Sequence, residues 1–143
     1  MLSIGLLGLA SLQAWGLRAT GNATYRSQAT LLAQDMIERI RGNLPGVTEG
    51  AYRFTAIDCD VLVNRCMGVG VCTPDQVATA DYFGVMCGAG ADGGVRGGLP
   101  NGSMTVECNP GALCTINLTW RELADQGSDG EARESSLRLD FKP

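Results

Sequence analysis

The sequence predicts an α+β fold, in which a long N-terminal helix packs on a small antiparallel sheet, with a disulfide-stapled loop and a short central helix between them. Three observations support this prediction. The first 41 residues have the composition and apolar spacing of one continuous helix. Three segments nearer the C-terminus alternate apolar and polar residues, as strands do. Six cysteines among 143 residues, with no Cys-x-x-Cys pair, are typical of an extracytoplasmic domain held by disulfides.

The first half of the predicted helix, residues 1–24, is almost entirely apolar and has no charged residue before Arg18. A helix of 41 residues would be about 60 Å long at 1.5 Å per residue. A globule of this size cannot bury that length, so we expect the apolar half to pack in lipid or against other subunits. The residues expected to do so are Leu2, Ile4, Leu6, Leu7, Leu9, Leu12 and Trp15.

The second half of the helix, residues 25–41, opens a globular domain that we expect to comprise residues 25–143. Its apolar side chains recur at steps of three and four, so they line one face that should pack on the sheet. Gly42, followed by Pro45, is predicted to end the helix. The expected packing residues are Tyr25, Ala29, Leu32, Met36 and Ile40.

The middle of the chain has one clear helix signal. Residues 43–50 are predicted to form a loop, and 51–63 irregular or short strand structure. A helix is predicted over about residues 74–86, because Thr73 is a good N-cap and Pro74 suits the first helical position. Residues 88–98 are dominated by glycine and are predicted to form a flexible loop.

The C-terminal part predicts an antiparallel sheet. Asn101-Gly102 is a tight-turn dipeptide that leads into a strand over residues 103–108. A second strand, 114–120, should pair with the first as a hairpin. After a turn at 126–130, the alternating leucines of residues 135–141 predict the closing strand.

Geometry reduces the possible cysteine pairings. Cys108 and Cys114 flank the hairpin loop and should face each other, so we predict that they pair. Cys72 and Cys87 bracket the central helix, and about 20 Å of helical rise is far beyond the span of a disulfide. Cys87 should therefore bond to either Cys59 or Cys66, and Cys72 to the other.

Composition excludes several functional classes. A net charge of −4 with scattered basic residues argues against nucleic acid as a partner. The chain has no histidine, which removes the commonest zinc ligand and the usual general base. We therefore predict no catalytic residues, no cofactor, no metal site and no enzymatic activity.

Three patterns that could suggest chemistry have simpler interpretations. Residues 88–93 match G-x-G-x-x-G as a string, but they follow a helix, whereas the nucleotide-binding version follows a strand. The carboxylates Asp58 and Asp60 lie two residues apart in a cysteine-rich loop and are expected to be exposed. A solvated acidic turn is expected, in place of a calcium loop, at Asp125, Asp129, Glu131 and Glu134.

The N-terminal sequence LSIGLLGLASLQ, continuing into ATYRSQATLLAQDMIERIRGN and a cysteine-bearing globule, resembles type IV pilin subunits. Residues 32–43 resemble, more narrowly, the PilV-type minor pilins, also called type IV pilus modification proteins. The resemblance implies a short basic leader, a Gly-Phe-Thr-like processing site and a nearby glutamate, none of which matches any residue here. We therefore expect a reading frame that starts upstream of Met1, or a chain shortened at that end.

The resemblance implies a structural role, in priming pilus assembly and in a tip complex, through helix packing with other pilins. It implies other minor pilins, pseudopilins and the major pilin as partners, with a tip adhesin as a further candidate. It also implies a single pass through the bacterial inner membrane, contact with its lipid before assembly, a periplasmic globule, and a place in the pilus at the cell surface afterwards.

Two alternatives remain open at this stage. Within the same class, the chain could be a minor pseudopilin of type II secretion. In a different class, residues 1–15 would be a cleaved signal peptide, and the remainder a secreted, disulfide-rich adhesin or binding module.

Overall fold

The computed structural model describes residues 2–61, 66, 71–88, 93–111, 113–122 and 132–143, and for residues 2–7, 10, 11 and 14 it describes the backbone alone. Within these residues the α+β fold predicted from the sequence is confirmed. The elements in chain order are α1 (Leu2–Gly42), α2 (Leu44–Thr48), β1 (Arg53–Phe54), α3 (Pro74–Cys87), α4 (Gly94–Gly98), β2 (Ser103–Cys108), β3 (Cys114–Glu122) and β4 (Arg133–Phe141).

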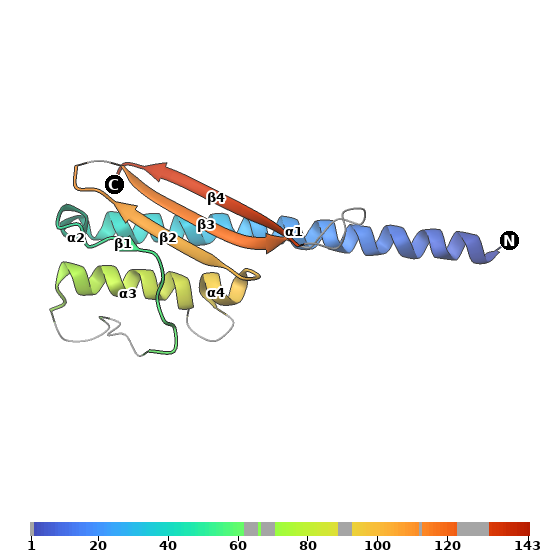
Figure 1. The fold of residues 1–143 in the computed structure, drawn as a ribbon, viewed down its shortest axis with the longest axis horizontal. Coiled ribbons are helices and arrows are strands. Elements are labelled where there is room, and N and C mark those ends of the chain that lie inside the picture. The colour runs from blue at the N-terminus through green and yellow to red at the C-terminus, as the bar shows by residue number, and fades with distance from the viewer. Residues whose placement is uncertain (1, 62–65, 67–70, 89–92, 112, 123–131) are drawn as a thin grey trace.

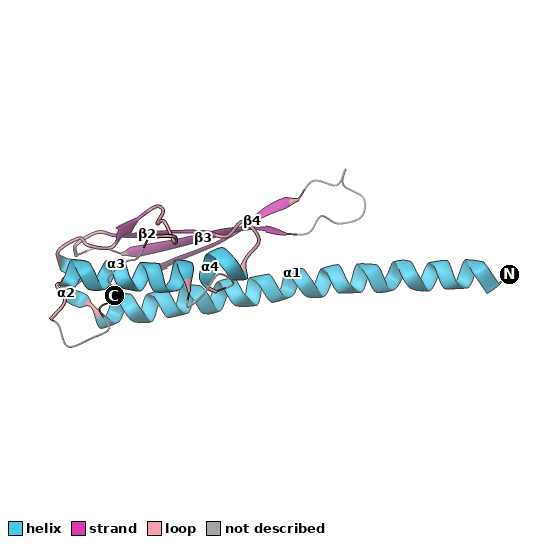
Figure 2. Ribbon diagram, turned by 90° about the horizontal axis from the view of Figure 1, so that it is seen from below, coloured by secondary structure: helices cyan, strands magenta, loops and turns pink. Residues whose placement is uncertain are grey.

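The elements form two layers. One is an antiparallel sheet of order β1-β2-β3-β4. The other consists of the C-terminal half of α1 and the helix α3, which lie side by side on one face of the sheet (Figures 1 and 2). The N-terminal half of α1 continues straight past the globule (Figure 1). The C-terminal half of α1 is therefore part of the folded domain, and its N-terminal half projects from that domain.

The strands have one buried and one polar face because successive side chains of a strand point to opposite sides. The helix-facing residues of β2 and β3 are buried, whereas those of β4 are only partly buried. Registers such as Val106 opposite Ile116, and Ile116 opposite Leu139, place these side chains in continuous rows. The buried set on β2 and β3 is Met104, Val106, Cys108, Cys114, Ile116, Leu118, Trp120 and Glu122.

Helix α3 begins with the cap that the sequence predicted. The Thr73 hydroxyl accepts from the Gln76 backbone at 3.3 Å, and the Gln76 side chain accepts from the Thr73 backbone at 3.0 Å. Farther along, the ring of Tyr82 stacks on Phe54 with centroids 4.5 Å apart, and its hydroxyl donates to the Met104 carbonyl. These contacts join α3 to β1 and β2, and burial raises the pKa of Tyr82 to about 12.

Two segments that were predicted to be loops contain short helices. Residues 94–98, inside the predicted flexible loop, form α4, because Val95 and the adjoining Leu99 are buried and tie this turn to the core. Gly94 has φ +65°, and a Cβ there would lie 2.5 Å from the Val85 carbonyl, so the close contact with α3 requires glycine. Residues 44–48 form α2, which begins at the N-cap Asn43.

The first predicted strand, 103–108, is present with its expected bounds, and the other two are longer than expected. The second extends to Glu122 and the third begins at Arg133, since pairing between β3 and β4 continues for two residues beyond the apolar alternation. Within residues 51–63, which were predicted to be irregular or to form a short strand, the two-residue strand β1 is present. The turn predicted at 126–130 lies outside the described residues.

Candidate assembly surface

The N-terminal half of α1 extends beyond the globule (Figures 1 and 2). Large apolar side chains along this half are exposed. The exposed fractions are 58% for Leu9, 70% for Leu12, 56% for Trp15 and 76% for Leu17. Predicted positions Leu2, Ile4, Leu6 and Leu7 lie on the helix backbone, and their side chains are outside the described residues. Soluble monomers rarely expose contiguous apolar surface of this kind, which is typical of an interaction site.

Among the helices of the described residues, none has a stretch that is both long enough and apolar enough to cross a membrane.

The C-terminal half of α1 is held in the core by one face. Ala29, Met36 and Ile40 are fully buried, and Tyr25 and Leu32 are partly buried against the same cluster, so all five predicted packing positions contact the core. Sequence reasoning missed Ala33, which is fully buried, and Ile37, which is partly buried. The periodicity could have identified both, since Ala33 lies four residues after Ala29, and Ile37 four after Ala33.

An ion pair joins α1 to the sheet where the helix enters the globule. The Arg26 guanidinium donates to both Glu122 carboxylate oxygens, at 2.7 and 3.1 Å, and the Glu122 side chain is only 7% exposed. The hydrogen bond from Arg26 lowers the pKa of Glu122, which burial alone would raise. Sequence reasoning missed Glu122, because the predicted second strand ended at Trp120.

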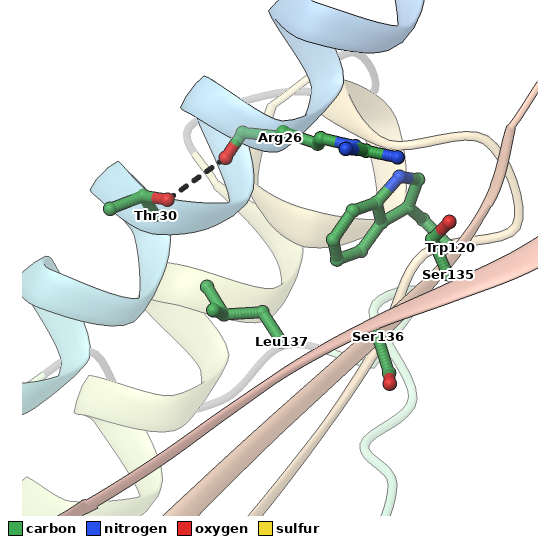
Figure 3. A pocket seen from close by; sticks show the side chains of 6 residues that line it. All are labelled: Arg26, Thr30, Trp120, Ser135, Ser136 and Leu137. Atoms are coloured by element: carbon green, nitrogen blue, oxygen red, sulfur yellow. Dashed lines mark hydrogen bonds between the residues drawn. The ribbon is translucent and has the colours of Figure 1, made fainter.

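A small depression of about 360 Å³ opens beside this ion pair, between α1 and the strands β3 and β4 (Figure 3). Its residues come from all three elements, and the Trp120 indole and Leu137 point toward α1 (Figure 3). The lining is Arg26, Thr30, Trp120, Ser135, Ser136 and Leu137. Trp120 Nε1 makes no hydrogen bond among the described residues, but it is close enough to Glu122 to help lower the pKa of that carboxyl.

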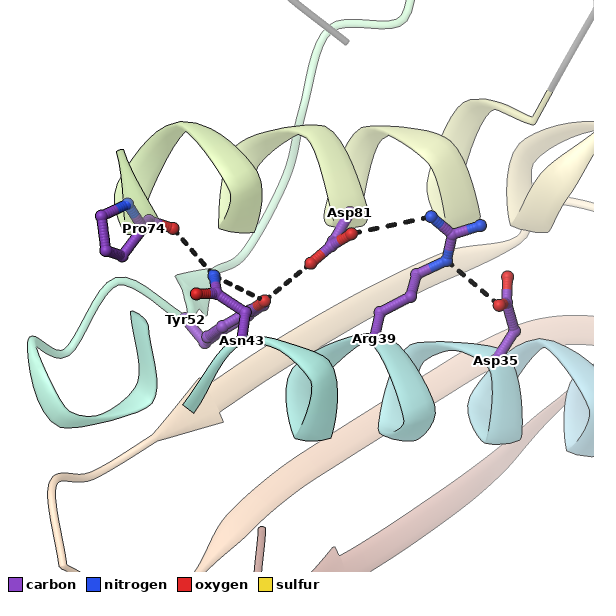
Figure 4. A network of polar contacts seen from close by, with 6 residues as sticks. All are labelled: Asp35, Arg39, Asn43, Tyr52, Pro74 and Asp81. Carbon is purple, nitrogen blue, oxygen red and sulfur yellow. Dashed lines mark hydrogen bonds and ion pairs between the residues drawn. The ribbon is translucent and has the colours of Figure 1, made fainter. Parts of the chain in front are cut away.

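A polar network connects the C-terminal end of α1 to α3 and β1 (Figure 4). The Asn43 amide donates to the Pro74 carbonyl at 2.8 Å and to the Tyr52 hydroxyl at 3.1 Å, and that hydroxyl donates to Asp81 at 2.7 Å. Arg39 forms ion pairs with Asp81 and Asp35. Burial, and the hydrogen bond to Asp81, raise the pKa of Tyr52, so this phenol stays neutral and can donate.

The cysteines form three disulfides. Cys108 is bonded to Cys114 across the hairpin loop, with Cα atoms 4.1 Å apart. Of the two arrangements that the sequence left open for the other four, the structure has Cys59 bonded to Cys87, at the end of α3, and Cys66 to Cys72, just before α3 begins. The Cys59–Cys87 bond closes a 28-residue separation and should stabilise the domain by roughly 3 kcal/mol.

The described residues show no metal centre. They contain no cluster of three or more metal-ligating side chains. Asp58 and Asp60 are exposed, as expected, and Asp60 lies 3.7 Å from Arg96. Residues 125, 129 and 131 of the predicted acidic turn lie outside the described residues, and so do residues 89–92 of the G-x-G-x-x-G string. Glu134 is an exposed residue of β4.

Comparison with protein-family models gives one match. The model of the Tt1218-like family, described as type IV pilin Tt1218, matches residues 11–83, just over half of the chain. The match begins in the exposed half of α1, covers the packed half, and ends within α3, before the long strands. Searches of curated proteins and of solved structures gave no match. From the family match, and the long helix packed on a disulfide-bearing α+β domain, we conclude that this chain belongs to the Tt1218-like family of type IV pilins.

Proposed function

We propose that this pilin is a PilV-type minor subunit that helps to prime pilus assembly and forms part of the tip complex. The family match supports a pilin-type structural role and association with other pilins at a pilus or the cell surface. The finer assignment rests on residues 32–43, whose sequence resembles that of PilV-type subunits.

The observation that carries the assembly role is the exposed apolar half of α1. Leu12 and Leu17 are at least 70% exposed, on a helix that the globule does not cover. Burying such a side chain against other helices stabilises an assembly by about 1.5–3 kcal/mol. Several of them on one rigid helix therefore provide a substantial part of the driving force for packing among subunits.

The two-part division of the chain belongs to the same proposal. Residues 1–24 would pack with other pilins, or contact inner-membrane lipid before assembly. Residues 25–143 would form the periplasmic, later surface-exposed, domain. The Arg26–Glu122 ion pair and the partly buried Tyr25 support this boundary, because they are where α1 becomes attached to the sheet. Other minor pilins, the major pilin and a tip adhesin are the proposed partners.

The test of this function is a charge placed on the exposed half of α1. Leu12→Glu, introduced in the chromosomal gene, should abolish incorporation of the subunit and reduce surface pili, because an unpaired carboxylate cannot be buried among helices. Leu44→Glu is the matched control, since Leu44 is 52% exposed but lies on α2. Pili are counted by electron microscopy, and the subunit is quantified in sheared filaments. Normal pili and normal incorporation with Leu12→Glu would refute the proposal.

The same strains separate the alternatives. A deletion that blocks enzyme secretion and leaves pili intact would assign the chain to type II secretion. Recovery of the mature chain from periplasmic fluid, starting at or beyond Trp15 and free of other subunits, would assign it to the secreted binding modules.

A further inference from the structure

The two edges of the sheet differ in length. β1, at one edge, has two residues and β4, at the other, has nine, and no described element pairs with the outer side of β4 (Figure 1). Proteins commonly protect an edge strand by making it short, or by a proline or a bulge. β4 has no proline, and its register with β3 is continuous from Arg133 to Phe141. β4 is therefore a long, regular edge with none of these three protections.

The main-chain groups that β4 leaves unpaired follow from the sheet register. In an antiparallel sheet, alternate residues of a strand bond to the neighbours on opposite sides. The Cys108 amide donates to the Tyr52 carbonyl at 2.8 Å, so even-numbered residues of β2 bond toward β1 and odd-numbered ones toward β3. The continuous registers then make the even-numbered residues of β3 bond to the odd-numbered residues of β4. The groups that point outward, which we call the β4 edge, are the amides and carbonyls of Glu134, Ser136, Arg138 and Asp140.

The side chains on the helix side of β4 are incompletely covered. Those of β2 and β3 on the same face are buried, whereas Leu137, Leu139 and Phe141 are only partly buried. The Arg41 guanidinium lies 5.9 Å from the centre of the Phe141 ring, and Ile37 of α1 is also partly buried. A strand added beside β4 would point every second side chain toward these residues. It would complete the burial that β4 lacks.

The depression beside the Arg26–Glu122 ion pair opens on this same side of β4 (Figure 3). It has a volume of about 360 Å³, and Ser135 and Leu137 contribute to its lining. A residue opposite either of them on an added strand would direct its side chain into the depression. Unpaired main-chain groups beside a pocket for alternate side chains are the two features by which proteins bind an extended peptide at a sheet edge.

We propose that the β4 edge binds an extended segment of a different polypeptide, which joins the sheet as a fifth, antiparallel strand and turns apolar side chains at alternate positions toward α1. From Glu134 to Asp140 the edge is about 20 Å long, so it pairs with about seven residues. This inference goes beyond the proposed function and does not depend on it.

A second copy of this chain fits the β4 edge less well. Two β4 strands pair antiparallel across a two-fold axis, which would point the projecting halves of the two α1 helices in opposite directions. Pairing of β4 with the other edge of a second copy is limited by β1, which has two residues. A segment of another polypeptide has neither restriction.

A synthetic peptide tests the pairing. The probe is a peptide of about nine residues, alternating threonine and valine with a lysine at each end. With about 1 mM peptide, hydrogen exchange of the full chain, measured by NMR, should slow at least about tenfold at the four amides of the β4 edge. The amides of Leu137 and Leu139, which already bond to β3, should change less. Without this alternation the proposal is wrong.

Two N-methylated forms of the peptide are the matched controls. In an antiparallel pair, the residues that bond to the β4 edge have their side chains on the polar face of the sheet. If the valines point toward α1, the threonine amides therefore face β4. Methylation of the threonine amides should weaken binding at least about tenfold, and methylation of the valine amides less than about threefold. Equal binding of the two forms, or the reverse order, would overturn the proposal.

Ser136→Pro tests the edge from the side of the protein. Residue 136 points its N–H outward, so proline removes one donor of the β4 edge and keeps the bonds to β3. Peptide binding should weaken at least about tenfold, whereas Ser136→Ala should bind as wild type does. Thermal unfolding checks the domain. Normal binding by Ser136→Pro would refute the site, and loss of its fold would show that residue 136 bonds to β3, against the assignment of the edge.

These measurements use the purified chain without pili, so they fail separately from the test of the proposed function. If the peptide does not bind while Leu12→Glu still blocks incorporation, strand addition is refuted and the proposed function stands. If the peptide binds while Leu12→Glu assembles normally, the reverse holds. Protection of the β4 edge that rises with protein concentration in the absence of peptide would assign this edge to a second copy and overturn the proposed occupant.

Discussion

The two halves of α1 are stabilised in different ways although they form one unbroken helix. In the C-terminal half, Met36 and Ile40 are fully buried, and Arg26 and Asn43 attach the helix at either end of the domain. In the N-terminal half, Leu9, Leu12 and Trp15 are more than half exposed, and the globule contributes no covering layer.

This difference shows that the same apolar residue types have two uses in one helix. A leucine or methionine that faces the sheet stabilises the monomer, whereas one on the projecting half can contribute only when another molecule covers it. Substitutions in the two halves should therefore separate folding from assembly. The expected losses of stability decrease from the buried core of the packed half to the exposed half.

The largest effect is expected from Met36→Ala. Met36 is fully buried between the layers, so its truncation leaves a cavity and should lower the free energy of unfolding by about 2–5 kcal/mol. Leu12→Ala, on the exposed half, should change that free energy by less than about 0.5 kcal/mol. Urea unfolding of the full chain in a mild detergent measures both. Equal losses would show that the projecting half is also part of the folded core.

A smaller loss is expected from Asn43→Ala, at the end of the packed half. The substitution removes the donor to Pro74 and Tyr52, leaving the Pro74 carbonyl without this partner (Figure 4). The free energy of unfolding should fall by about 1–3 kcal/mol. Hydrogen exchange should show the last turn of α1 and the first turn of α3 losing protection together. Unchanged exchange in α3 would contradict the role of Asn43 as the link between the two helices.

Glu122→Gln should produce a still smaller loss in the free energy of unfolding, and this loss should depend on pH. The pKa of Glu122 is lower in the folded chain than its ordinary value of 4.5, so the carboxylate stabilises the fold above that pH. This contribution disappears as the pH falls through the folded-state pKa. The difference in the free energy of unfolding between wild type and Glu122→Gln should thus be constant from neutral pH to about 5.5. It should shrink as the pH falls below 4.5. Urea midpoints measured at a series of pH values provide the test, and a difference that persists at low pH would contradict it.

The smallest effect, and the only stabilising one, is expected from Gly16→Ala. A Cβ at Gly16 meets no atom within 4 Å, and alanine favours a helix by up to about 1 kcal/mol over glycine. The exposed half should exchange its amides more slowly, and the urea midpoint of the domain should not move. A shift in that midpoint would mean that the two halves unfold as one unit.

The layout of the fold could be predicted from local signals in the sequence. The long helix, the Thr73 cap, the hairpin and the closing strand follow from spacing, capping and alternation, which short stretches of chain express by themselves. Such signals also identified the apolar surface at Leu9, Leu12 and Trp15, because an uncharged helical run has to be covered by something.

Only the tertiary structure decided the features that join distant parts of the chain. The Arg26–Glu122 ion pair spans 96 positions, and Asn43, Tyr52 and Asp81 meet only because α1, β1 and α3 converge. Helix α4 forms where glycine content predicted a loop, since burial of Val95 and Leu99 outweighs the low helix propensity of glycine. A sequence pattern records what each segment prefers locally, whereas contacts of this kind depend on which segments the fold brings together.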